Sequence, residues 1–182
     1  MPRSVLFILC LLPLAAFARD WRVDPARSTL DFHGSYDGEG FDGRFRRFTA
    51  HIAYDPADLA TAHFDVSVDL ASADTGNAER DDTLQGGDFF ATGHFPQARF
   101  VTEAFSKAGD GSVEAKGKLT LRDQTRPVVL KVVFTETGDG ATLDASTTLA
   151  RKDFGLGTAG DWDGIGAEVA VKARLVLGPG GP

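Results

Sequence analysis

The stretch that decides the fold is Phe64-Asp65-Val66-Ser67-Val68-Asp69-Leu70, in which apolar and polar residues alternate strictly. Side chains of a β-strand point alternately to its two faces, so the apolar residues of this stretch share one face and the polar residues share the other. This pattern is typical of an antiparallel strand with one buried and one solvated face.

Further segments on both sides show the same alternation. They are Ser28–Gly34, Arg44–Tyr54, Ala98–Phe105, Val113–Arg122, Val128–Thr135, Ala141–Ala150 and Glu168–Leu177. Turn-forming residues separate them, for example Asp55-Pro56, Gly109-Asp110-Gly111 and Gly138-Asp139-Gly140. Eight strands joined by short turns predict an all-β protein with an antiparallel barrel, because closure of the sheet leaves no exposed edge.

Residues 77–85 depart from the alternation and predict one short helix between the strands. Asn77 can cap its first turn, Glu79 and Asp81 follow in that turn, and Gly86 can end it.

The two ends of the chain are expected to lie outside the barrel. Arg3, the apolar run 5–14 and the small residues at 16 and 18 are typical of a secretory signal. We therefore expect a cleaved signal peptide at residues 1–18, one barrel domain at residues 19–177 and a flexible tail at residues 178–182. The only cysteine, Cys10, lies in the signal, so a mature protein without disulfides or thiol chemistry is expected.

Composition narrows the function. A net charge of −7 disfavours nucleic-acid binding. Phenylalanine occurs 14 times against two tyrosines and two tryptophans, and such apolar rings without polar tips suit a hydrocarbon ligand. A barrel of eight strands can hold one slender ligand, but it can also be filled by its own side chains, and composition alone leaves both alternatives open.

Motifs for catalysis are weak. Two GxGxxG strings, at residues 38–43 and 155–160, lack the strand-to-helix context of a dinucleotide site and are interpreted as loops. The histidines His33, His51, His63 and His94 have no metal-ligand spacing. We therefore expect no catalytic residue, no metal site and no cofactor, with a metal-dependent enzyme built from these histidines as the less favoured alternative.

A cluster of cations, Arg44, Arg46 and Arg47, lies beside strand-forming phenylalanines. These arginines are candidates for contact with an anionic head group at a cavity mouth. The alternative, which is favoured in an acidic protein, is a solvated strand face.

Several ordered blocks resemble a known family. They are residues 21–32 with Trp21 and Asp24-Pro25, 43–45, 54–56, 80–84 with Arg80-Asp81, 88–90, 95–100 with Phe95-Pro96, 117–121, 125–128 and 151–155. Together they resemble the YceI-like (lipid/polyisoprenoid-binding) proteins of the bacterial periplasm. The resemblance implies a lipocalin-like barrel in the periplasm whose apolar tunnel carries a polyisoprenoid without chemistry, and it favours the cavity over the filled core.

Residues 35–41 look like a branch of this family found beside cytochrome b561-type membrane proteins. That likeness implies an isoprenoid quinone as ligand and a cytochrome b561-like protein as a candidate partner, and a homodimer is left open. We predict that inward-facing strand residues line the tunnel. The predicted lining is Phe32, Phe45, Phe48, Phe64, Val66, Val68, Phe100, Leu119, Leu130, Val132 and Phe134.

Overall fold

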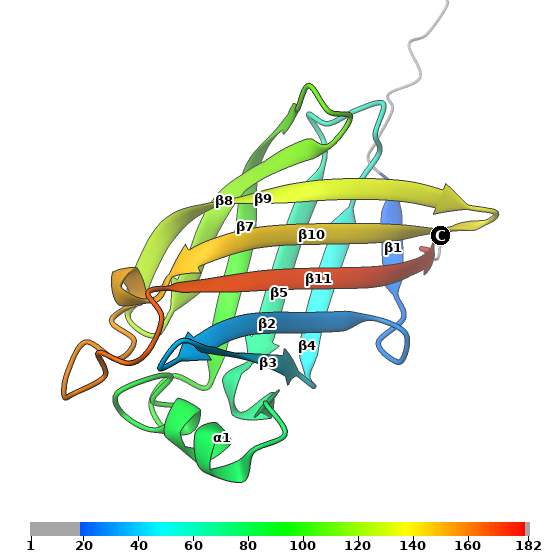
Figure 1. Cartoon of the computed structure of the whole chain (residues 1–182). Coiled ribbons are helices and arrows are strands. Elements are labelled where there is room, and N and C mark those ends of the chain that lie inside the picture. Colours follow the sequence, from blue (N-terminus) through cyan, green and yellow to red (C-terminus); the bar gives the residue numbers. More distant parts are fainter. Residues whose placement is uncertain (1–18, 181–182) are drawn as a thin grey trace, which may run out of the picture.

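The computed structural model of the protein describes residues 19–180, which form a twisted antiparallel barrel (Figure 1). The expected signal peptide, residues 1–18, lies outside the described residues. The strands are β1 (Asp20–Val23), β2 (Thr29–Tyr36), β3 (Glu39–Phe45), β4 (Phe48–Ala53), β5 (His63–Asp69), β6 (Ala73–Asp74), β7 (Gln97–Lys107), β8 (Val113–Leu121), β9 (Gln124–Thr137), β10 (Gly140–Ala150) and β11 (Glu168–Pro179). The helices are α1 (Ala78–Gln85) and the short 3₁₀ turns η1 (Leu70–Ser72) and η2 (Arg151–Phe154).

The first hairpin is bent, and this bend explains how so many strands make a barrel of eight. β1 and β2 together form one side of the hairpin, and β3 and β4 form the other. Trp21 of β1 pairs with Ile52 of β4, and Asp31 of β2 pairs with Arg44 of β3. The remaining order is β5, β7, β8, β9, β10 and β11, and β11 pairs with β1 to close the barrel. The predicted eight-stranded antiparallel barrel is confirmed.

Two local predictions are wrong. Residues 38–43 were expected to be a glycine-rich loop, but most of this string belongs to β3, where Gly43 lies directly opposite Phe32. Residues 178–182 were expected to be a flexible tail, but β11 continues through Pro179, which pairs with Trp21. Residues 181–182 lie outside the described part of the chain.

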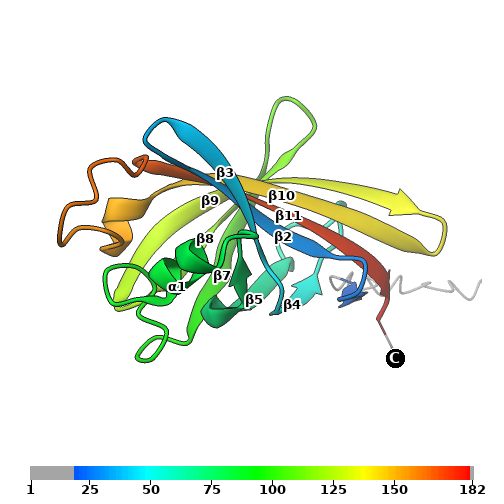
Figure 2. The ribbon, with the colours of Figure 1, turned by 60° about the horizontal axis from the view of Figure 1, so that its bottom comes forward.

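The predicted helix is present as α1. The side chain of Asn77 accepts a hydrogen bond from the backbone N–H of Arg80 at 3.0 Å, and Gly86 follows the last turn. α1 and the loops beside it lie at one end of the barrel (Figure 2). None of the helices in residues 19–180 is long and apolar enough to cross a membrane.

The other end of the barrel is filled by a cluster that we call the aromatic plug, formed by Trp21, Tyr54, Phe64, Phe105 and Phe134. The ring of Tyr54 lies 4.9 Å from Phe134 and 5.8 Å from Phe64 between centroids. The indole N–H of Trp21 donates a hydrogen bond to the carbonyl oxygen of Tyr54 at 2.9 Å. The plug therefore has aromatic packing at its centre and a satisfied polar group at its edge.

Candidate ligand cavity

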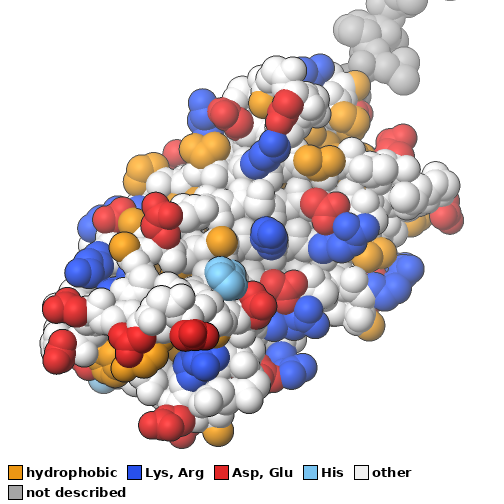
Figure 3. Space-filling model, viewed as in Figure 1, with side chains coloured by type: hydrophobic (Ala, Val, Ile, Leu, Met, Phe, Trp, Pro, Cys, Tyr) orange, Lys and Arg blue, Asp and Glu red, His pale blue; other side chains and the backbone are white. Residues whose placement is uncertain are grey.

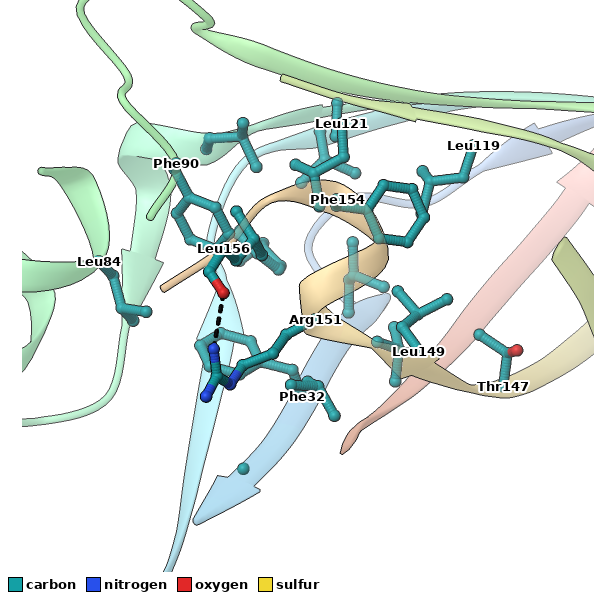
Figure 4. A pocket seen from close by; sticks show the side chains of 18 of the residues that line it. Phe32, Leu84, Phe90, Leu119, Leu121, Thr147, Leu149, Arg151, Phe154 and Leu156 are labelled. Carbon is teal, nitrogen blue, oxygen red and sulfur yellow. Dashed lines mark hydrogen bonds between the residues drawn. The ribbon is translucent and has the colours of Figure 1, made fainter. Parts of the chain in front are cut away.

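A cavity of about 590 Å³ occupies the half of the barrel between the aromatic plug and α1. Its walls are mostly leucine, valine and phenylalanine side chains, many of them visible in Figure 4. This volume lies within the usual range of small-molecule sites in proteins. Both alternatives, a filled core and a cavity, therefore occur in one barrel, because one half is filled by side chains and the other half is hollow.

Nine of the predicted lining residues border the cavity. They are Phe32, Phe45, Phe48, Phe64, Val66, Val68, Phe100, Leu119 and Leu130. The other two, Val132 and Phe134, share the inward face of β9 but lie deeper, where Val132 is buried and Phe134 belongs to the plug. Alternation places a residue on the inner face of the wall, but it does not reveal how far the plug extends.

Glycines keep the wall thin where two large rings lie against it. A Cβ atom at Gly43 would overlap the ring of Phe32, and one at Gly117 would lie 2.8 Å from the ring of Phe100. Both phenylalanines also line the cavity. Because glycine has no side chain, each ring can rest on the neighbouring strand instead of crossing the lumen.

Residues outside the barrel strands complete the cavity at the α1 end. Phe89 and Phe90, in the segment after α1, are buried and border the cavity, and so do Phe154 of η2 and Leu156. Figure 4 shows Phe90, Phe154 and Leu156 around the same space, with Leu84 of α1 nearby. None of these residues was predicted as lining, since alternation identifies strand residues only. The resemblance blocks at residues 80–84, 88–90 and 151–155 are the sequence signal that could have found all of them except Leu156.

One cation lies at the cavity margin without a carboxylate partner. The guanidinium of Arg80 stacks over the ring of Phe41 at 4.3 Å, and both residues line the cavity. Within residues 19–180 no ion pair joins Arg80 to an acidic side chain. Asn77 and Glu79 border the same region, so charged and amide side chains gather at the α1 end of a mostly apolar cavity.

Arg151 is a second cation in the wall, and its role is structural. Its side chain is 3% exposed and donates to five backbone carbonyl oxygens, those of Leu156, Gly157, Trp162, Ile165 and Gly166, at 2.7 to 3.2 Å. Five N–H groups meet five acceptors, so the buried guanidinium is fully satisfied. Arg151 therefore ties both ends of the loop between η2 and β11 to η2, and Figure 4 shows the bond to Leu156.

The three predicted head-group arginines do not line the cavity. Arg44 pairs with Asp31 at 2.6 Å, Arg46 pairs with Asp74, and Arg47 pairs with Asp69 at 2.9 Å. All three pairs are at the surface, in agreement with the alternative of a solvated strand face. Figure 3 shows the same arrangement on one face of the molecule, where positive and negative side chains lie beside one another.

The titratable groups with shifted pKa values belong to the scaffold. The hydrogen bond from Arg99 lowers the pKa of Asp65, and hydrogen bonds from Lys131 and Ser112 lower that of Asp110. Burial raises the pKa of Tyr54 in the plug. His33 contacts Asp42 across the β2–β3 hairpin at 2.8 Å. In residues 19–180, no three His, Cys, Asp or Glu side chains form a group that could hold a metal ion.

A closed antiparallel barrel with an apolar cavity at one end defines a lipocalin-like protein. The chain belongs to the YceI-like domain family, which matches residues 21–177. It is 32% identical over 170 residues to a UPF0312 protein of Vibrio cholerae, an alignment that covers 88% of this chain and 90% of the relative.

Solved structures agree with the fold. The crystal structure of BcnA from Burkholderia cenocepacia superposes with a TM-score of 0.81 at 30% identity, covering 85% of this chain and 99% of BcnA. A polyisoprenoid binding domain from Saccharophagus degradans superposes with a TM-score of 0.68 at 15% identity, covering 90% of this chain and 99% of that domain.

Proposed function

We propose that the protein is a periplasmic carrier that holds an isoprenoid lipid or isoprenoid quinone inside its barrel. The observation that carries this proposal is the cavity of about 590 Å³, whose wall is mostly apolar. Each methylene group transferred from water into such a cavity contributes about 0.8 kcal/mol, so part of a prenyl chain is enough for tight binding. The family and the polyisoprenoid binding domain of similar fold support binding over catalysis.

The polarity of the cavity gives the ligand a direction. The hydrocarbon tail points toward the aromatic plug, and the head group lies at the α1 end beside Arg80. A guanidinium without a carboxylate partner can donate hydrogen bonds to a quinone carbonyl, a hydroxyl or a phosphate oxygen. This assignment replaces Arg44, Arg46 and Arg47, whose donors are engaged with aspartates. Export, a cytochrome b561-like partner and a homodimer stay predictions.

The first experiment is mass spectrometry of an organic extract of the protein, purified from bacterial periplasm without detergent. A stoichiometric prenyl lipid or quinone is expected. Two variants locate it: Val68→Trp fills the cavity, whereas Val133→Trp adds the same bulk to a side chain that is 44% exposed. V68W should lose the lipid and V133W should keep it. Extracts without lipid, together with no uptake of added ubiquinone, would overturn the proposal.

A further inference from the structure

The wall of the barrel is split between β9 and β10. The two strands are paired from the turn at Thr137 and Gly140 as far as Lys131 and Ser146. Beyond that point, no pairing joins residues 124–130 of β9 to residues 147–150 of β10 within the described chain. β9 stays paired with β8 along this stretch, so only its edge toward β10 lacks a partner.

The sequence of this stretch fits an open edge. Pro127 lies in the part of β9 that is paired with β8 but not with β10, and it has no backbone N–H to donate. Proline is tolerated in a sheet mainly where one edge of the strand has no neighbour. At its far end the split is bounded by η2, where the guanidinium of Arg122 donates to the carbonyl oxygen of Gly155 at 3.0 Å.

The split lies between the inner cavity and a hollow on the outer surface of the barrel. That outer groove is lined by Val129 and Lys131 of β9 and by Thr148 of β10, and the turn before β8 overhangs it through the Lys131–Asp110 ion pair. Ser146 and Thr147 border the groove and the inner cavity alike. Figure 4 shows Thr147 on β10 next to Leu149 of the cavity wall.

Apolar side chains mark the outside of both openings. Within the described residues, the large hydrophobic side chains that are exposed are Tyr36, Val129 and Val133. Tyr36 lines the cavity at the α1 end and Val129 borders the split, whereas Val133 lies in the paired part of β9, opposite Asp144. Large apolar groups exposed next to an opening favour contact with hydrocarbon over contact with water.

We propose that the β9–β10 split is a side portal through which the hydrocarbon chain of the ligand enters and leaves the cavity. The proposal rests on the carrier function proposed above. Widening the wall here breaks no ladder hydrogen bond, whereas widening it between fully paired strands breaks several. The hydrocarbon chain can therefore pass sideways through the split while the loop between η2 and β11, held by Arg151, keeps its position at the α1 end.

The test closes the split with a short cross-link. In a Cys10→Ser background, the pair Val129→Cys and Thr148→Cys is joined across the open stretch with bismaleimidoethane, and the matched pair Thr135→Cys and Thr142→Cys is joined across the paired stretch. Each pair capped with N-ethylmaleimide is the unlinked control. The readout is the rate at which a dansyl-labelled geranylgeranyl chain leaves the protein for phosphatidylcholine vesicles.

Cross-linking V129C/T148C should slow release at least tenfold, while cross-linking T135C/T142C should leave the rate within twofold of its capped control. Equal rates in both cross-linked proteins would overturn the portal and leave the α1 end as the route. A protein that does not bind the labelled chain at all would instead overturn the carrier function, so the two failures are distinguishable.

Discussion

The two halves of the barrel use the same kinds of residue but differ in how they are filled. In the plug, the rings of Tyr54, Phe64 and Phe105 contact one another and close the lumen. In the hollow half, the rings of Phe32 and Phe100 lie against glycines of the adjacent strands, Gly43 of β3 and Gly117 of β8. The difference teaches that glycines on neighbouring strands give large rings a place in the wall, so phenylalanine content alone does not determine whether the lumen is filled.

The largest expected effect comes from the same truncation made in each half. Leu177→Ala in the filled half should cost about 3 kcal/mol, because Leu177 is 2% exposed and packs against the plug. Leu119→Ala should cost about 1 kcal/mol, because Leu119 already borders empty space. Urea unfolding of both variants measures the difference, and equal losses would contradict the contrast between the halves.

Arg151→Met tests the rim of the hollow half and should cost about 2 kcal/mol. The methionine fills part of the space but leaves carbonyl oxygens at both ends of the loop between η2 and β11 without donors. Limited proteolysis should then cut residues 155–166 first while the plug stays intact. Arg47→Gln is the control, since it breaks a surface ion pair and should change stability by less than about 0.5 kcal/mol. Similar losses of stability in both variants would show that Arg151 does not hold the loop in place.

Gly43→Val should fill part of the cavity and lower the free energy of unfolding by about 1 kcal/mol. The new side chain displaces the ring of Phe32 toward the cavity, so affinity for a prenyl probe should fall at least tenfold. Gly87→Val is the matched control, because nothing lies within 4 Å of a Cβ atom there. Unchanged probe binding in G43V, measured by fluorescence titration, would contradict the role of this glycine.

The smallest expected effect is alkaline loss of stability through the plug. Burial raises the folded-state pKa of Tyr54 above its ordinary value of 10.0, so the neutral phenol is favoured in the folded protein. The associated stability is present below about pH 10 and is lost as the pH rises toward the folded-state pKa. Urea midpoints at about pH 9 and about pH 11 should differ more for the wild type than for Tyr54→Phe. An equal drop in both proteins would assign the effect elsewhere.

Much of the fold could be predicted from the sequence because one face of each strand is buried. The alternation at Phe64–Leu70 gives β5, and the cap at Asn77 gives α1. β3 was missed because its glycines interrupt the alternation, and they lie against rings of the adjacent strand, Gly43 against Phe32 and Gly40 against His33. A pattern within one segment carries no information about such a contact.

The sequence predicts which strand residues face the inside of the barrel, but not how far along the barrel the cavity extends. Inward-facing residues such as Val66 and Leu130 follow from alternation, whereas the position of the plug depends on how rings from distant strands meet. The predicted head-group arginines were outward-facing because Asp31, Asp69 and Asp74 lie across from them in the folded chain. The two cations that border the cavity, Arg80 and Arg151, lie on α1 and η2, where strand periodicity gives no guidance.

The hydrogen bonds of Arg151 make the α1 end of the barrel insensitive to mild acid and to salt. Its acceptors are amide carbonyls, which neither take up protons in mild acid nor exchange their partner for a dissolved ion as exposed carboxylates do. The Lys131–Asp110 pair beside the β9–β10 split is exposed, so dissolved salt weakens it, while the lowered pKa of Asp110 keeps its carboxylate ionised in mild acid. A rise in salt concentration therefore acts on the split and spares the loop that Arg151 holds, so salt can set how fast cargo is exchanged without altering the frame that holds it.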